Sequence, residues 1–201
     1  MPIDDEPTPF WDGDGEAEYV AAWARKVFRA GWGKVEPAGN GTTGRALDEH
    51  YLRPLGIARE QTWITDCVDT YCISEAGRRA IDARFKPFAA AHGLPQTELL
   101  AHRSDRTIVE EAIADHLSRL RRELRRASPS VVMTLGSAAA RVFAAVVDVP
   151  DPGGLRVDGY GARRAFTLAG KSLDWYPLVH PRARRQIAHW TSAHELWCAA
   201  R

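Results

Sequence analysis

The sequence has few cysteines, no long apolar run and almost no net charge, and each shortage excludes a class of protein. Three cysteines cannot build the disulfide framework of a small secreted domain. Cys67 and Cys72 have no second Cys or His pair near them, so we expect buried thiols and no metal site. No apolar stretch approaches the ~20 residues that cross a bilayer. A net charge of +1 argues against indiscriminate binding to polyanions.

The composition is that of a folded soluble protein. Hydrophobic residues at 45% and charged residues at 26% suffice for one compact core in a chain of 201 residues. Residues 1–15 are rich in Pro, Asp and Gly, which predicts a flexible arm before a single domain over 16–201. The first residues are acidic where a signal peptide would be basic, so we expect a cytoplasmic protein. We also expect it to be a monomer.

Hydrophobic periodicity predicts strands that alternate with helices. The expected helices cover 16–25, 45–52, 75–91, a stretch from 104 to just before 129, and 182–200, and the expected strands cover 26–32, 61–68, 130–135, 165–168 and 176–179. A glycine-rich loop is expected over 33–44. Alternation of this kind favours an α/β fold with a mostly parallel sheet covered on both faces, a three-layer αβα sandwich. In its clearest unit, Gly136 makes the turn after a strand and Ser137 caps the next helix.

The C-terminal part carries the most distinctive pattern. The apolar run 175–179 stops at His180, turns at Pro181 and continues into a helix that begins with Arg182, Arg184 and Arg185. This order places a titratable side chain beside a basic turn at the carboxyl edge of the sheet, where α/β folds bind ligands. The alternative is that His180 only caps the turn and that the arginines face water.

Three segments, in this order, resemble the uracil-DNA glycosylase superfamily, and most closely its family-4-like branch. Residues 41–66 are similar to the glycine-containing loop, helix and second strand of that family. The stretch Pro129 to Ala140 looks like its central strand, glycine and helix, and Leu178-Val-His180-Pro181 looks like its C-terminal His-Pro motif. The resemblance implies a glycosylase that excises a damaged base from DNA after the nucleotide leaves the stack.

The resemblance assigns roles to several residues. His180 matches the family histidine that donates a hydrogen bond to the departing base, over a base-sized cavity. Arg182 and Arg184 would enter the minor groove or contact the DNA backbone. Gly136 and Ser137 would offer backbone amides to a phosphate at a helix N-terminus.

The sequence also departs from the family. The first motif should hold a residue that positions the attacking water, and Glu36 is the nearest carboxylate, either catalytic or simply solvated. Thr42 stands where the family has a base-stacking phenylalanine; Trp32, Tyr51 or Tyr71 would have to replace it, or else each belongs to the core. Three cysteines cannot hold the four-cysteine iron-sulfur cluster of family-4-like enzymes, so we expect no cofactor.

Asp66 is the departure with a chemical consequence. It stands where the family has an asparagine that reads the Watson-Crick edge of uracil. An ionised aspartate only accepts hydrogen bonds, which favours a base with an amino group on that edge over uracil. The alternative is that Asp66 only caps a turn. For the whole chain, the alternatives to a glycosylase are a catalytically silent nucleic-acid-binding member of the fold and a pocket for free nucleotides.

Overall fold

The computed structural model describes residues 41–201 except 70, 71, 74, 92, 94–99 and 102. The expected arm over 1–15, the first expected helix and strand, Trp32, Glu36 and Tyr71 all lie outside the described residues. None of the helices in the described part of the chain is long and apolar enough to cross a membrane.

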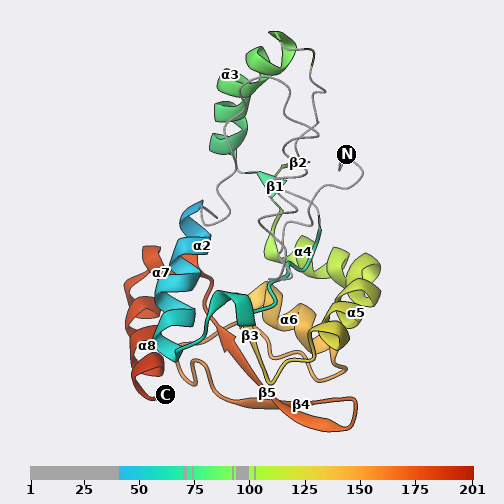
Figure 1. Ribbon diagram of the computed structural model, residues 1–201, viewed down its shortest axis with the longest axis vertical. Coiled ribbons are helices and arrows are strands. Elements are labelled where there is room, and N and C mark those ends of the chain that lie inside the picture. Colours follow the sequence, from blue (N-terminus) through green and yellow to red (C-terminus); the bar gives the residue numbers. More distant parts are fainter. Residues whose placement is uncertain (1–40, 70–71, 74, 92, 94–99, 102) are drawn as a thin grey trace.

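A three-stranded sheet lies in the lower part of the molecule as Figure 1 shows it. Its strands are β3 (Val131–Leu135), β4 (Arg164–Leu168) and β5 (Lys171–Leu178), in the order β3-β5-β4. β5 pairs in parallel with β3 and antiparallel with β4. Ala169 and Gly170 join β4 to β5 with φ of 49° and 80°, the positive values of a tight two-residue hairpin turn. The α/β class is thus confirmed, and the described sheet is mixed where the sequence predicted a mostly parallel one.

Helices connect and cover the strands. They are α2 (Gly41–Leu47), a π-helical turn (Asp48–Leu52), two short 3-10 turns (Arg53–Leu55 and Arg59–Gln61), α3 (Glu75–Ala91), α4 (Asp105–Glu111), a π-helical turn (Ala112–His116), α5 (Leu117–Ala127), α6 (Ser137–Val146), α7 (Pro181–Gln186) and α8 (Ala188–Ala199). Ser104 caps α4, because its hydroxyl accepts a hydrogen bond from the Thr107 amide at 3.2 Å.

Side chains from both faces of the sheet pack against helices. On one face, Phe143 of α6 contacts Phe166 and Trp175, and the Trp175 indole donates to the hydroxyl of Thr134 at 2.9 Å. On the other face, Leu178 packs with two buried aromatic rings, Tyr51 and Trp197. Strand residues alternate between the two faces, so that β5 is fixed from both sides. This packing determines where the end of β5, and therefore His180, lies.

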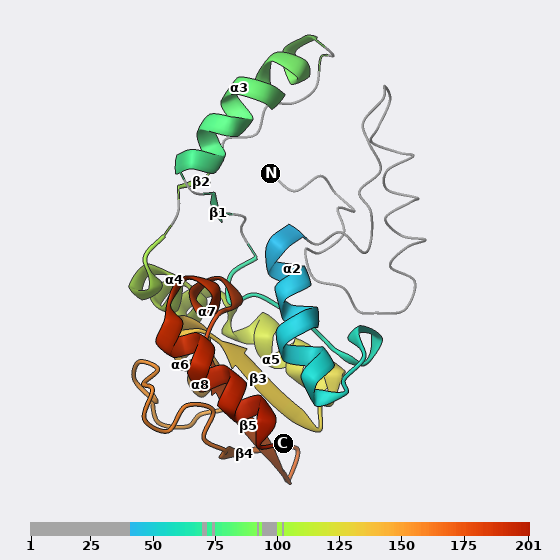
Figure 2. The ribbon, with the colours of Figure 1, turned by 90° about the vertical axis from the view of Figure 1, so that its left-hand side faces the viewer.

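β1 (Cys72–Ile73), α3 and β2 (Leu100–Ala101) stand away from the rest of the molecule (Figures 1 and 2). The two short strands pair in parallel where the chain leaves and re-enters the main body. We call these three elements, β1, α3 and β2, the protrusion. Its helix, α3, has the bounds that the sequence predicted.

Several local predictions are wrong for identifiable reasons. The expected strand over 61–68 makes no ladder in the described structure, and an arginine side chain binds the carbonyls of Asp66 and Cys67. The expected glycine-rich loop becomes helical from Gly41 onward. The expected C-terminal helix is two helices, since Ile187 is extended (φ −129°, ψ 108°) between α7 and α8.

Candidate active site

His180 lies directly beyond the end of β5, next to the end of β3. Gly136 follows β3 with φ of 106°, and its amide donates to the carbonyl of Leu178 at 2.7 Å. A Cβ at Gly136 would lie 3.6 Å from the Cβ of His180, so the two strand ends are in contact. The predicted position of His180 at the carboxyl edge of the sheet is therefore what the structure shows, and Gly136 lies beside it.

The imidazole of His180 has one nitrogen occupied. Nδ1 accepts a hydrogen bond from the backbone amide of Arg182 at 3.2 Å, so His180 caps α7 as the alternative interpretation expected. Desolvation, followed by the positive charge of Arg182, lowers its pKa below the usual 6.5, although the residue reaches the surface. The ring is therefore neutral at pH 7. Because Nδ1 is an acceptor, the proton resides on Nε2, which is left as the hydrogen-bond donor.

The first turn of α6 lies beside this histidine. Gly136 rather than Ser137 occupies the N-cap position, which corrects the prediction that Ser137 caps the helix. The Ser137 hydroxyl instead accepts a hydrogen bond from the amide of Leu155 at 3.1 Å and so holds the loop that follows α6. The amide of Gly136 is bound within the sheet, so an anion at this helix end would meet the amides of the first turn from Ser137 onward.

The two predicted DNA-contacting arginines have different environments. Arg182 is exposed. Arg184 is buried at 9% relative exposure, and its guanidinium lies 3.5 Å from the carboxylate of Glu195 on α8. A contact from Arg184 to a phosphate would require that its side chain leave Glu195.

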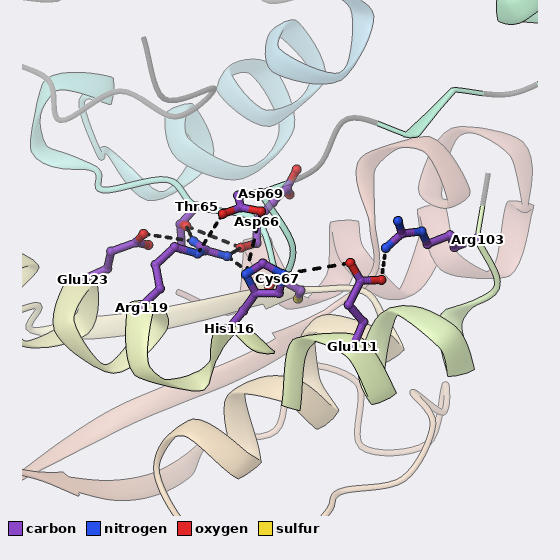
Figure 3. A network of polar contacts seen from close by, with 9 residues as sticks. All are labelled: Thr65, Asp66, Cys67, Asp69, Arg103, Glu111, His116, Arg119 and Glu123. Atoms are coloured by element: carbon purple, nitrogen blue, oxygen red, sulfur yellow. Dashed lines mark hydrogen bonds and ion pairs between the residues drawn. The ribbon is translucent and has the colours of Figure 1, made fainter. Parts of the chain in front are cut away.

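Arg119 of α5 holds the segment that contains Asp66 (Figure 3). Its guanidinium donates to the backbone carbonyls of Asp66 and Cys67 at 2.9 and 3.1 Å, and to the Thr65 hydroxyl at 3.2 Å. Glu123, one turn along α5, binds the same guanidinium at 2.9 Å. Desolvation raises the pKa of the Asp66 carboxyl, and the charge of Arg119 partly opposes that rise. Asp66 therefore lies on an extended segment fixed through its backbone.

Ion pairs tie both ends of the protrusion to the same helices (Figure 3). Asp69, just before the protrusion, lies 3.8 Å from His116, and Arg103, just after it, pairs with Glu111. The other nitrogen of His116 lies 3.9 Å from Glu111, so this histidine bridges the two attachments.

Three of the predicted site residues remain. Thr42 belongs to α2, which packs against α7. Glu36 and Trp32 lie outside the described residues, and the expected cavity beneath His180 stays a prediction. A cavity of about 290 Å³ lies elsewhere, between α5, α6 and β4, with Arg121, Leu124 and Leu168 in its wall. Tyr51, considered as a stacking platform, is fully buried and belongs to the core.

Sequence reasoning missed a buried polar chain behind His180. Tyr51 donates its hydroxyl hydrogen bond to the carbonyl of Val179 at 2.6 Å. Tyr160 accepts from the amide of Val179 at 3.1 Å, and its oxygen lies 2.8 Å from Nδ1 of His194. The three side chains are separated by up to 143 positions in the sequence, and each alone looks like an ordinary core residue. Only the fold brings them together.

Comparison with family models gives one match over most of the chain. The model described as the uracil DNA glycosylase superfamily matches residues 24–199. The chain belongs to the uracil-DNA glycosylase superfamily. Comparison with curated proteins and with solved structures found no match. The matched residues include the end of β3, the His-Pro segment and Asp66.

The cysteines of this superfamily member do not fit an iron-sulfur cluster. Cys67 packs against the apolar cluster of α4 and α6, whereas Cys198 packs against the cluster on the opposite face of the sheet. Burial raises the pKa of the Cys67 thiol to about 12, the reverse of what a thiolate ligand needs. Among the described residues, no group of His, Cys, Asp and Glu side chains is placed to hold a metal ion.

Proposed function

We propose that the protein is a DNA glycosylase that hydrolyses the N-glycosidic bond of an extruded damaged or modified base. Water attacks the sugar C1′, the bond from C1′ to the base nitrogen breaks, and the base departs with the electron pair, leaving an abasic site. Within the superfamily we place the chain nearest the family-4-like branch, as a divergent member. Its complete domain would have the three-layer αβα arrangement around a mostly parallel sheet.

The neutral His180 supports this proposal most strongly. Negative charge develops on the departing base, and an N–H aimed at a base oxygen stabilises it more in the transition state than in the ground state. A charged imidazolium would also attract the base oxygen before the bond breaks, so it would discriminate less between the ground state and the transition state. The Arg182 amide on Nδ1 directs the only ring proton to Nε2, which is the donor that this chemistry needs.

The contacts to DNA would come from the elements beside His180. Arg182 is exposed on the first turn of α7 and can reach a phosphate or the minor groove. The first turn of α6 offers backbone amides to a phosphate on the other side. Arg184 would contribute only after it leaves Glu195, so we assign the main contact to Arg182.

Asp66 would read the base edge. Its ionised carboxylate accepts hydrogen bonds and repels the uracil carbonyl that an asparagine would bind, so the preferred base carries an amino group on that edge. Glu36 would position the water. If Glu36 does not reach the water, the protein is the catalytically silent binding member that the degenerate first motif favours.

The test is a panel of DNA duplexes, each with one uracil or one modified base, incubated with wild-type protein and with His180→Ala. Cleavage of abasic sites by alkali reports base release. We expect release by the wild type from at least one amino-bearing base, and about 10²- to 10³-fold slower release by His180→Ala. Salt-dependent binding without any release would show a silent DNA-binding protein, and binding to free nucleotides alone would contradict both DNA-based accounts.

A further inference from the structure

Tyr51 and Tyr160 bind the two backbone polar groups of Val179, the residue before His180. The Tyr51 hydroxyl binds the carbonyl of Val179, which belongs to the peptide bond that leads into His180. The Tyr160 hydroxyl binds the amide of the same residue. Val179 is buried at 3% exposure, so water does not compete for either group. The two peptides that flank Val179 are therefore each held by one tyrosine hydroxyl, and the second of them leads into His180.

His194 fixes the direction of the Tyr160 hydroxyl. Tyr160 already accepts from Val179, so its own hydrogen points to Nδ1 of His194 at 2.8 Å. The His194 proton is then on Nε2 and donates to the carbonyl of His50 at 2.7 Å. His194 is buried at 1% exposure, and its desolvation, with a smaller effect from Arg184, lowers its pKa and keeps it neutral. The Cys198 thiol lies 3.5 Å from the same Nε2 and donates to the same His50 carbonyl at 3.8 Å, so that carbonyl accepts from both side chains.

We infer that Tyr51, Tyr160 and His194 are positioning residues that set the direction of the His180 imidazole, and the inference rests on the proposed function for what that imidazole does. His180 is extended (φ −66°, ψ 139°) at the start of α7. Because its side chain turns with its backbone, the direction of its Nε2–H depends on the orientation of the Val179–His180 peptide. Loss of the Tyr160 hydroxyl leaves the amide of Val179 and Nδ1 of His194 unpaired in the core. These two unpaired polar groups then favour a local change of the backbone that leads into His180.

The experiment compares Tyr160→Phe and Tyr51→Phe with a matched control, Tyr176→Phe. Tyr176 lies on β5 and its hydroxyl binds Asp174 at 3.3 Å, away from Val179. A second control is Trp175→Phe, which removes the buried bond to Thr134 and reports a loss of stability that does not pass through Val179. Ring-nitrogen NMR spectra of His180 give the first readout, and single-turnover base release with the affinity for abasic-site DNA gives the second.

We expect wild-type His180 to show the single Nε2–H form, and Tyr160→Phe to shift its ring nitrogens toward an average of two forms. Base release by Tyr160→Phe should fall about tenfold, with affinity for abasic-site DNA within about twofold and both controls near wild type. Combined with His180→Ala, Tyr160→Phe should cause no further loss, because it acts through His180. Tyr51→Phe should show the same pattern more weakly.

An unchanged His180 spectrum in Tyr160→Phe and Tyr51→Phe would overturn the inference. The inference would also fail if Tyr160→Phe slowed base release as much in the His180→Ala background as it does in the wild type. It would fail too if Trp175→Phe lost as much base release as Tyr160→Phe at the same drop in melting temperature. A wild-type protein that releases no base refutes the proposed function alone, since the NMR spectra still decide whether the tyrosines position His180. If Tyr160→Phe does not fold, Tyr51→Phe decides, because it removes only one donor.

Discussion

His180 and Asp66, the two side chains proposed to meet the base, are held in different ways. The carbonyl and the amide of Val179, the residue before His180, are each bound by one neutral tyrosine hydroxyl in the core. The segment of Asp66 is bound by one guanidinium, Arg119, on the surface of α5. Buried neutral bonds are insensitive to salt, whereas partly exposed charged contacts are screened by it. The bonds that hold the backbone before His180, the proposed donor, should therefore not depend on salt, whereas the bonds that hold the segment of Asp66, the proposed base reader, should weaken as salt is added.

The largest effect is expected for packing behind His180. Gly161 has φ of +59°, and a Cβ there would lie 2.4 Å from the ring of Trp197. Gly161→Ala should lower the free energy of unfolding by about 3 kcal/mol, from overpacking together with the left-handed backbone. Urea unfolding measures it.

Gly159 provides the matched control for that substitution. It has φ of +76° and nothing within 4 Å of a new Cβ, so Gly159→Ala should cost only about 1 kcal/mol, from the backbone alone. Equal losses at the two positions would show that the Trp197 contact does not constrain this region.

The next effect concerns the choice of base. Asp66→Asn restores a side chain that both donates and accepts, and it should raise uracil release relative to an amino-bearing base by about tenfold, the value of one exchanged hydrogen bond. Competition between the two substrates in one reaction measures the ratio. A wild-type protein that already prefers uracil would contradict the assignment of Asp66.

The pH offers a second way to change the same side chain. Although Asp66 reaches the surface, desolvation by the surrounding protein raises its pKa above the usual 3.8, so the protonated carboxyl, which donates like an amide, persists to higher pH than in a free aspartate. Preference should therefore move toward uracil as the pH falls through that raised pKa. Asp66→Asn is the control, because its ratio of substrates should not change with pH.

A smaller effect is expected when the clamp on that segment is removed. Arg119→Gln should reduce discrimination between bases a few-fold and leave the His180-dependent step unchanged, since one guanidinium contributes about 1 to 3 kcal/mol to the local structure. Arg122 lies on the same helix and is exposed, so Arg122→Gln is the control. Equal effects of the two variants on discrimination would mean that helix charge, rather than the bonds to 65–67, is what matters.

The sequence predicted those parts of the molecule that depend on local pattern. The bounds of α3, the strand that became β3 and the position of His180 just beyond the last strand follow from periodicity and turn residues. The segment 61–68 has the β-branched and aromatic residues of a strand, yet its carbonyls are bound by Arg119, more than 50 residues away. No local pattern indicates a partner of that kind, and the same is true of Tyr160 and His194 behind Val179.

A titration of the His180 ring nitrogens by NMR tests the central claim most directly. The account predicts a neutral ring at pH 7 with its proton on Nε2, and protonation only below the usual pKa of 6.5, because desolvation and Arg182 disfavour the charged form. The acid limb of base release should follow the same titration. A ring that is charged at pH 7, or that carries its proton on Nδ1, would contradict the account.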